Sequence, residues 1–263
     1  MGRWNIRWSI LLVLWCVTGV KLAAMKVESL DRGWFFNRGY ESQAADKVTV
    51  DLPHTWNAAD AMFGNVNYYR GMSTYSRFIV VPSSENFKRV FLRVKAAQTV
   101  ADVYLDNLFV GQLIGGYTYF TVELTHLIRR GEKQKLDIRV SNAQTMEIAP
   151  ICGDFNIWGG LNRGVELLYT DDACIDPTFY GSFGVFFTQY NVSEKYAGLE
   201  MKALLSGTEM ALNDCSIEFS LLDAKHKVVW CKETSVSGKE ALVKMELNNP
   251  HLCDRVNDPN LYT

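Results

Sequence analysis

Residues 100–110 (VADVYLDNLFV) decide the class of fold, because they contain two short apolar runs joined by a tight turn. Asp106 and Asn107 both tolerate the left-handed backbone conformation. They lie between the runs Val103–Leu105 and Leu108–Val110. Two such residues between apolar runs are typical of a two-residue β-hairpin. The stretch therefore predicts a pair of antiparallel strands.

Short alternating or apolar runs of the same kind continue on both sides of this hairpin, broken by Gly, Asn, Asp and Pro. Few stretches have helical periodicity over twelve or more residues. Many short strands at this spacing predict an all-β protein built of sandwiches. The further predicted strands are Lys47–Leu52, Thr74–Val81, Val90–Val94, Val100–Leu105, Phe120–Leu124, Lys135–Val140, Val165–Tyr169, Gly184–Thr188, Gly198–Leu205, Ser216–Leu222, Val228–Thr234 and Ala241–Leu247.

The strand-rich sequence divides into two blocks, with a predicted boundary at Thr170–Pro177, where acidic residues and a proline interrupt the runs. Residues 25–170 suit a large jelly-roll sandwich. Residues 171–263 suit an immunoglobulin-like sandwich of about six strands. Leu261-Tyr262-Thr263 resembles the start of another strand. We therefore expect the second sandwich to be incomplete at its C-terminus.

Composition excludes some classes of protein. Hydrophobic residues make up 48% of the chain and charged residues 21%, as in ordinary globular proteins. The formal net charge is -2, and no basic run is long enough to follow a phosphate backbone. Nucleic acid is therefore not an expected partner. Aromatic residues reach 13%, which suits both sugar faces and β cores, and we expect most of them to fill cores.

The N-terminus resembles a signal peptide, residues 1–24. Arg3 and Arg7 precede the apolar stretch Ser9–Val20, and small residues follow at Leu22-Ala23-Ala24. The stretch is shorter than the roughly 20 apolar residues of a membrane-spanning helix. Export is thus the prediction, to a secreted or periplasmic location, with an uncleaved membrane anchor as the alternative. Bulky Trp15 before Cys16 argues against a lipoprotein signal.

Five cysteines follow the predicted signal peptide, and no pair of them has metal-site spacing. A hairpin turning near Asp223–His226 would place Cys215 on its apolar face and Cys231 on the other, so these two should not form a disulfide. We expect scattered buried or free thiols, not a disulfide framework. The full set is Cys152, Cys174, Cys215, Cys231 and Cys253.

Several segments, in order along the chain, resemble glycoside hydrolase family 2, which includes β-galactosidases and β-glucuronidases. The last and most specific of them resembles the segment that closes the family's sugar-binding domain. The segments are Gly33-Trp34-Phe35-Phe36, Val50–Trp56 (VDLPHTW), Tyr69-Arg70-Gly71 with Tyr75–Phe78 (YSRF), Ala101–Asn107 with Gly115–Phe120 (GGYTYF), and Gly153–Val165 (GDFNIWGGLNRGV).

The resemblance implies a jelly roll, then an immunoglobulin-like domain, then a catalytic TIM barrel as a further partner domain. In a retaining enzyme the barrel carries two glutamates with carboxyl groups roughly 5 Å apart. After Pro177 the chain shows no strands alternating with long helices, so we expect no catalytic residues here. The resemblance also implies no cofactor and a terminal β-linked, galactose-like sugar as ligand.

Two positions depart from the family pattern. Gly164 stands where the family usually has Asp or Asn before the valine. Leu252-Cys253-Asp254 stands where close relatives have Leu-Trp-Asp, and losing a large ring at a packed site costs about 3–5 kcal/mol. These departures leave open a truncated or decaying gene product.

Asp154 is the predicted sugar-binding residue, because in the resemblance this aspartate reaches the mouth of the barrel and accepts hydrogen bonds from sugar hydroxyls. Capping of a loop turn is the alternative for Asp154. Asn156 and Trp158 share its loop and are expected at the pocket edge, with a core position equally open for Trp158. Arg163 is expected to pair with a carboxylate and hold the loop.

Other polar residues are weaker candidates. Asn67, Tyr69 and Arg70 precede a strand that can end near the same mouth, and His54 lies in a segment that resembles a packing motif. No Ser-His-Asp or metal-binding constellation stands out, so no metal ligand is predicted. Asn191-Val192-Ser193 matches a glycosylation acceptor, a pattern that is frequent by chance.

The leading hypothesis is the non-catalytic N-terminal portion of a retaining exo-β-glycosidase, most similar to a β-galactosidase, that hydrolyses O-glycosyl bonds. A free-standing carbohydrate-binding module and a non-functional truncated product are the alternatives.

Overall fold

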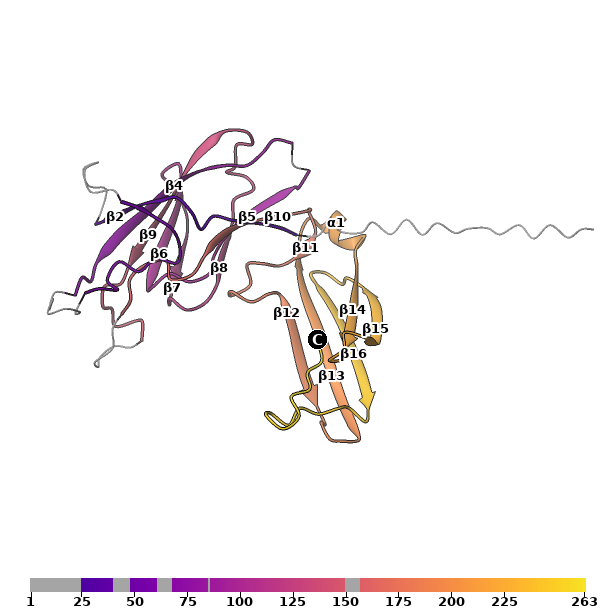
Figure 1. Ribbon diagram of the computed structural model, residues 1–263. Coiled ribbons are helices and arrows are strands. Elements are labelled where there is room, and N and C mark those ends of the chain that lie inside the picture. The colour runs from indigo at the N-terminus through magenta and orange to yellow at the C-terminus, as the bar shows by residue number, and fades with distance from the viewer. Residues whose placement is uncertain (1–24, 40–47, 61–67, 85, 150–156) are drawn as a thin grey trace, which may run out of the picture.

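The computed structural model describes residues 25–39, 48–60, 68–84, 86–149 and 157–263 of the chain. These residues form strands almost throughout, arranged in two lobes (Figure 1). The all-β prediction is confirmed. The predicted signal peptide, Asp154, Asn156, Cys152 and Asn67 all lie outside the described residues. Within the described ranges, no helix is long and apolar enough to span a bilayer.

The first lobe is a sandwich of two antiparallel sheets. One sheet has six strands in the order β3-β2-β4-β9-β6-β7, and the other has four in the order β1-β10-β5-β8. The strands of the larger sheet are β2 (Trp34–Arg38), β3 (Val48–Val50), β4 (Met72–Val80), β6 (Val100–Leu105), β7 (Leu108–Ile114) and β9 (Lys133–Ser141). Those of the smaller sheet are β1 (Lys26–Ser29), β5 (Arg89–Val94), β8 (Phe120–Glu123) and β10 (Val165–Thr170).

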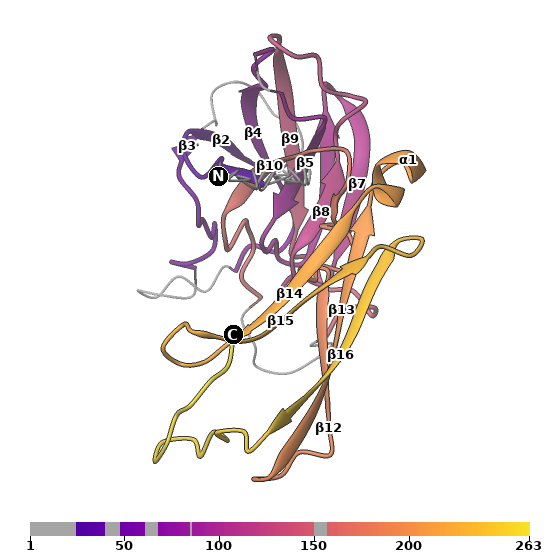
Figure 2. The ribbon, with the colours of Figure 1, turned by 90° about the vertical axis from the view of Figure 1, so that its right-hand side faces the viewer.

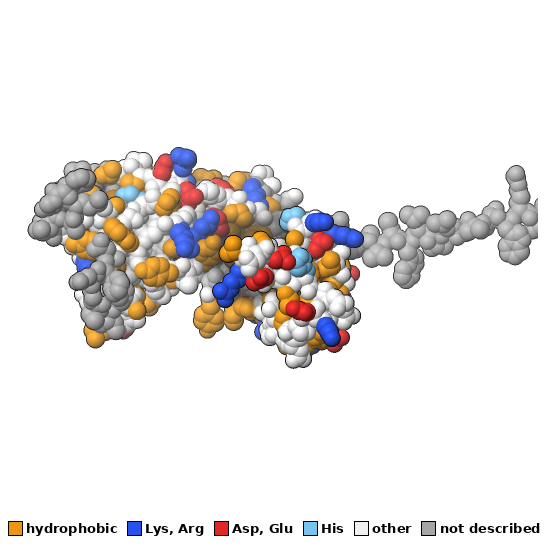
Figure 3. Space-filling model, turned by 60° about the horizontal axis from the view of Figure 1, so that its bottom comes forward, with side chains coloured by type: hydrophobic (Ala, Val, Ile, Leu, Met, Phe, Trp, Pro, Cys, Tyr) orange, Lys and Arg blue, Asp and Glu red, His pale blue; other side chains and the backbone are white. Residues whose placement is uncertain are grey.

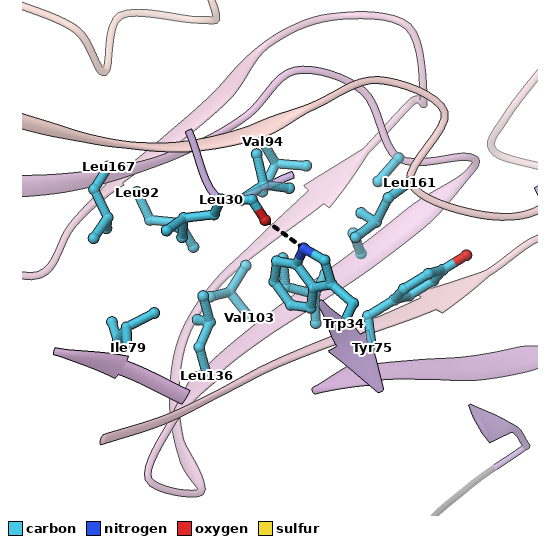
Figure 4. Packing of buried hydrophobic residues seen from close by; sticks show 14 of the residues in the cluster. Leu30, Trp34, Tyr75, Ile79, Leu92, Val94, Val103, Leu136, Leu161 and Leu167 are labelled. Carbon is cyan, nitrogen blue, oxygen red and sulfur yellow. Dashed lines mark hydrogen bonds between the residues drawn. The ribbon is translucent and has the colours of Figure 1, made fainter. Parts of the chain in front are cut away.

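The hydrophobic core of this lobe lies between the two sheets. Trp34 is fully buried at its centre, and its indole N–H donates a 2.6 Å hydrogen bond to the Leu30 carbonyl (Figure 4). The ring is thus buried without leaving its polar atom unpaired. Alternate residues of facing strands fill the space around it, as a half-buried pleated sheet requires. The labelled neighbours in Figure 4 are Tyr75, Ile79, Leu92, Val94, Val103, Leu136, Leu161 and Leu167.

The predicted hairpin at Asp106 and Asn107 is confirmed. Leu105 in β6 pairs with Leu108 in β7, and φ is 49° at Asp106 and 66° at Asn107. The Asp106 carboxylate accepts hydrogen bonds from the Lys135 backbone N–H (2.8 Å) and the Gln134 amide (2.9 Å). These bonds lower the pKa of Asp106, the Gln134 bond most strongly.

The second lobe packs a sheet of β11, β12, β13 and β16 against the two-stranded sheet β14–β15. The strand bounds are β11 (Cys174–Ile175), β12 (Val185–Tyr190), β13 (Tyr196–Ser206), β14 (Ser216–Leu222), β15 (Val228–Ser235) and β16 (Glu240–Asn248). One short helix, α1 (Glu209–Asn213), begins after Thr208, whose hydroxyl accepts a hydrogen bond from the Ala211 N–H. Each lobe has its own core cluster, whereas a domain boundary near Thr170–Pro177 stays a prediction.

Some expectations need correction. α1, β1 and β11 were not predicted, because a five-residue helix and strands of four and two residues are too short to show a period. Leu261-Tyr262-Thr263 does not form a strand, although Thr263 exchanges two backbone hydrogen bonds with Leu222.

The prediction of free or buried thiols is confirmed for the four cysteines that the structure describes. Cys215 is half-buried and Cys231 exposed, and neither forms a disulfide, as the predicted hairpin requires. Cys174 is a buried free thiol, and Cys253 is exposed and free. Position 253 is therefore not a packed site among the described residues.

The outer face of the smaller sheet joins the two lobes. Phe91 and Leu168 point away from the first core and form a separate buried cluster with Cys174 of the second lobe. This contact explains why Leu168, on the outer face of β10, is fully buried. Charged side chains of both signs are interspersed on the face drawn in Figure 3, in keeping with the small net charge.

Arg89 makes the polar part of this junction. Its guanidinium bonds both Glu123 carboxylate oxygens, at 3.0 and 2.8 Å. It also donates to the Asp172 carbonyl (3.2 Å), within the predicted boundary segment, and to the Ser206 hydroxyl (2.9 Å), beyond it. One side chain thus connects β5 with β8 and with the second lobe. A guanidinium can do so because it carries several donors in one plane.

Substitution of Arg89 by Met keeps most of the apolar stem and removes these bonds. We expect a loss of about 1–3 kcal/mol in the free energy of unfolding, measured by urea titration. Arg32→Met is the matched control, because the Arg32–Asp51 ion pair is exposed and should be worth less than about 1 kcal/mol. Equal effects of the two substitutions would contradict the role assigned to Arg89.

Candidate functional site

The predicted sugar-binding loop follows β9, and its base is closed by the side chain of Asn142, which is fully buried. The Asn142 amide donates to the carbonyls of Ile157 (3.0 Å) and Tyr69 (3.2 Å). Its oxygen accepts the Gly71 N–H at 2.9 Å. One side chain thereby joins the two ends of the segment 143–156 and ties both to the strand entry at Tyr69–Gly71.

Asn57 makes a second connection to the same point. It is also fully buried, and its amide donates to the Ile157 carbonyl at 3.0 Å. Its oxygen accepts the Gly159 N–H at 3.0 Å. The Ile157 carbonyl therefore accepts two amide donors, one from Asn57 and one from Asn142. Buried amides that both donate and accept in this way fix a backbone position, because any displacement leaves polar groups unpaired.

The chain after Ile157 continues as part of the sandwich wall. The Trp56 N–H donates to the Gly159 carbonyl (3.0 Å), and the His54 N–H donates to the Leu161 carbonyl (2.9 Å). A Cβ at Gly159 would lie 2.1 Å from the Trp56 ring, and one at Gly160 would lie 2.3 Å from the His54 carbonyl oxygen. The two consecutive glycines are thus required by close contact with the VDLPHTW segment.

Trp158 is the member of the predicted site that the structure describes. Its neighbours Ile157 and Gly159 are buried, whereas the Trp158 side chain is 39% exposed. An indole held at the end of a fixed segment offers a flat apolar face and one N–H donor to solvent. Its placement in a pocket with Asp154 and Asn156 stays a prediction.

The expected partner for Arg163 is absent from the part of the chain that the structure describes. Arg163 is exposed there and forms no ion pair with a described carboxylate. Asp31 holds this part of the chain instead, since its Oδ1 accepts the Val165 N–H at 2.8 Å. A Cβ at Gly164 would lie 2.6 Å from the same oxygen. Gly164 thus leaves room for the Asp31 carboxylate, which gives this departure from the family pattern a physical reason.

The remaining candidates have packing positions. The Tyr69 hydroxyl donates to the Met72 carbonyl at 2.8 Å, and its ring contacts that of Trp56. Arg70 is exposed, and its guanidinium lies over the ring of Tyr68. Tyr69 and Arg70 thus make packing contacts with described residues. No contact of either residue with the predicted sugar-binding pocket is described.

His54 is half-buried between aromatic rings. Its Nδ1 lies 2.7 Å from the Tyr75 hydroxyl, and its ring centroid lies 4.8 Å from that of Phe36. Burial lowers the pKa of His54 and raises that of Tyr75, so both are neutral at physiological pH. The packing interpretation of His54 is confirmed.

The residues that sequence reasoning missed are Asn57 and Asn142. Asn57 stands directly after the VDLPHTW motif, and Asn142 stands two residues after the end of the predicted strand Lys135–Val140. The one local sign of a structural role for Asn57 and Asn142 is a polar amide near the end of an apolar run. Nothing in the sequence indicates that both bond the same carbonyl.

Known proteins match this chain over nearly its whole length. It is 36% identical over 239 residues to a β-glucuronidase of Bacteroides fragilis, covering 89% of the chain and 34% of that protein. The solved structure of an FMN-binding β-glucuronidase from Facaelibacterium prausnitzii superimposes with a TM-score of 0.80 at 30% identity, covering 90% of the chain and 36% of that structure. The chain belongs to glycoside hydrolase family 2.

A β-galactosidase of Thermoanaerobacterium thermosulfurigenes is a more distant family 2 relative, 23% identical over 251 residues. It matches 90% of the chain and 34% of its own length. No protein-family model matches the chain. The chain thus spans about a third of the length of these family 2 relatives, and the prediction of the family is confirmed.

Replacing Asn142 by Asp tests the closure of the loop base in this family 2 chain. The carboxyl group would face the Tyr69 and Ile157 carbonyls without the amide donors, so we expect a loss of about 3 kcal/mol or more in the free energy of unfolding. The Gly159 amide hydrogen should also exchange faster. Asn107→Asp, the same change in an exposed turn, is the control. If Asn107→Asp lowered the free energy of unfolding as much as Asn142→Asp, the role of Asn142 in closing the loop base would be refuted.

Gly164→Asn restores a residue type usual in family 2 and tests the space taken by Asp31. The new Cβ should displace the Asp31 carboxylate, with a loss of about 1–3 kcal/mol in the free energy of unfolding. Asp31→Ser shortens the side chain. It should lower the free energy of unfolding less in the Gly164→Asn variant than in the wild-type chain. A double-mutant cycle measured by urea titration gives this coupling, expected at about 1 kcal/mol. Additive effects would show that residues 31 and 164 do not interact.

Proposed function

We propose that this chain is the sugar-orienting, non-catalytic portion of a retaining exo-β-glycosidase that hydrolyses O-glycosyl bonds. The observation that carries the proposal is the pair of hydrogen bonds that the Asn57 and Asn142 amides donate to the Ile157 carbonyl. It fixes the base of the loop in which the family motif contains Asp154, Asn156 and Trp158. A fixed loop base suits a residue that must orient a substrate, because small displacements of a positioning group reduce the rate strongly.

In this proposal Asp154 accepts hydrogen bonds from sugar hydroxyls, Asn156 adds a donor and an acceptor, and Trp158 lies along the sugar face. The acid/base and nucleophile carboxylates belong to a TIM barrel that lies outside these 263 residues. Residues 25–170 form the sugar-orienting domain and residues 171–263 the connecting one. Residues 1–24 direct export, so the enzyme acts in the periplasm or outside the cell.

The sugar is proposed from the relatives. The 36% identical relative is a β-glucuronidase, and the 23% identical relative is a β-galactosidase. A β-glucuronide is therefore the first substrate to assay, and a β-galactoside is the second.

The test is Asp154→Ala in a form of the protein that includes the barrel. We expect kcat/KM for the better aryl glycoside to fall about 10- to 100-fold, which corresponds to one charge-assisted hydrogen bond made to the reacting sugar. Asp214→Ala is the control, because Asp214 is exposed at the end of α1 in the other lobe. If the Asp154→Ala enzyme kept the wild-type kcat/KM, Asp154 would cap a turn of the loop and would not bind the sugar.

The chain of 263 residues provides the complementary measurement. We expect no hydrolysis of either aryl glycoside and monosaccharide binding of millimolar or weaker affinity, since the cost of ordering the sugar opposes a single hydrogen bond. Micromolar affinity without hydrolysis would favour a free-standing carbohydrate-binding module instead.

A further inference from the structure

A cavity of about 470 Å³ lies between the two lobes. Its first-lobe wall consists of residues 112–114 of β7 and residues 118–121 at the start of β8. Its second-lobe wall consists of residues 176 and 178–181, from the connection between β11 and β12. The volume falls within the range of about 300–1,000 Å³ that is usual for small-molecule sites. We call it the interlobe cavity.

The first-lobe wall is made of two free strand edges. β7 ends the larger sheet and β8 ends the smaller one, and both lie on the same side of the lobe (Figure 2). Backbone groups alternate in direction along a strand. Because the Gly115 N–H bonds toward β6, the backbone groups of Gln112 and Ile114 point away from β6. Because the Leu124 N–H bonds toward β5, those of Thr121 point away from β5. Backbone donors and acceptors thus face the cavity side of both strands.

The second-lobe wall contains a tight turn. The Ser182 N–H donates to the Phe179 carbonyl at 2.9 Å, and φ is 45° at Tyr180 and 70° at Gly181. Two central residues with positive φ define a type I′ turn, which favours Asn, Asp or Gly at the first of them. The glycine is required, because a Cβ at Gly181 would lie 2.2 Å from the Tyr119 carbonyl oxygen. The bulky Tyr180 therefore occupies a position that suits a small or amide residue.

Packing does not account for a tyrosine in this turn. The Tyr180 side chain is 91% exposed, and its ring lies edge-on to that of Phe179, with 5.0 Å between the ring centroids. Phe179 is itself 40% exposed. A bulky residue held at positive φ with its ring in solvent indicates a functional constraint, since burial does not repay the backbone strain. The cavity rim thus presents two aromatic rings to solvent.

The charge of the lining limits the class of ligand. Asp176 is the one charged residue among the described residues that line the cavity. Its Oδ1 accepts the N–H and the hydroxyl of Thr178, at 2.8 and 2.6 Å, so the carboxylate is held in place and can accept further donors. The described lining has no Lys or Arg, so it offers no cation to a carboxylate or phosphate group. It suits a neutral ligand that carries hydrogen-bond donors.

We propose that the interlobe cavity binds a neutral oligosaccharide. The rings of Phe179 and Tyr180 lie against the apolar faces of its sugar rings, while Asp176 and the edge groups of β7 and β8 bond its hydroxyls. A flat aromatic ligand without hydroxyls would leave these polar groups unpaired. An anionic sugar would bring a second negative charge beside Asp176. The inference goes beyond the proposed function, because none of these residues belongs to the loop of Asp154.

The experiment titrates the chain of 263 residues with four tetrasaccharides and follows its backbone amides by NMR. The neutral probes are cellotetraose, mannotetraose and xylotetraose, and the anionic probe is tetragalacturonate. We expect at least one neutral probe to shift the amide signals of Thr118, Thr121 and Gly181, with a Kd of about 1 mM or below. Tetragalacturonate should bind at least about tenfold more weakly.

Tyr180→Asn is the decisive variant. It creates the Asn-Gly pair that a type I′ turn favours, so Tm should stay the same or rise. Loss of the ring should raise the Kd of the neutral probe about fivefold or more. Phe78→Asn is the matched control, because Phe78 is an exposed ring on β4 that does not line the cavity. Its Kd should equal that of the wild-type chain.

Three results would overturn the proposal. The first is the absence of shifts at these amides with all three neutral probes at about 10 mM. The second is a Tyr180→Asn variant that binds the neutral probe as tightly as the wild-type chain. The third is tetragalacturonate binding as tight as that of the neutral probes. If Asp154→Ala abolished binding and Tyr180→Asn did not, the sugar would bind at the loop of Asp154, so the cavity proposal would fail while the proposed function stood.

Discussion

The candidate site depends on one backbone oxygen, the carbonyl of Ile157, which accepts hydrogen bonds from two fully buried amides. Asn57 and Asn142 come from segments far apart in the sequence, and each also accepts a backbone N–H. The oxygen, two amides and two N–H groups form a network in which no member can move alone. The glycines and aromatic rings around it then pack against a wall whose position is already determined.

The junction between the lobes follows from a second constraint, the double-sided burial of the smaller sheet. Its inner face fills the first core, and its outer face bears Phe91, Leu168 and Arg89, which need a cover. Cys174, Ser206 and the Asp172 carbonyl provide that cover. The burial of Leu168 on the outer face of β10 thus reflects the presence of a neighbouring lobe.

Much of the fold could be predicted from local patterns. The Asp106-Asn107 turn and most strands depend on residues adjacent in sequence, where alternation and turn chemistry are informative. The residues that hold the candidate site could not be predicted in the same way. Asn57 bonds residues about a hundred positions away, and Asp31 bonds Val165. The carboxylate that bonds the segment after Arg163 likewise comes from the other end of the lobe, whereas an ion pair of Arg163 itself stays a prediction.

The closing contacts of the first lobe join its two chain ends. β1 pairs with β10, from Lys26 with Tyr169 to Ser29 with Glu166, and Asp31 bonds Val165 beside them. Chain synthesis is vectorial, so the early strands emerge well before the strand that completes their sheet. Long-range pairings are also slow to form, since the intervening loop must be closed first. A nascent chain would thus carry uncovered strand edges until about residue 170 had emerged.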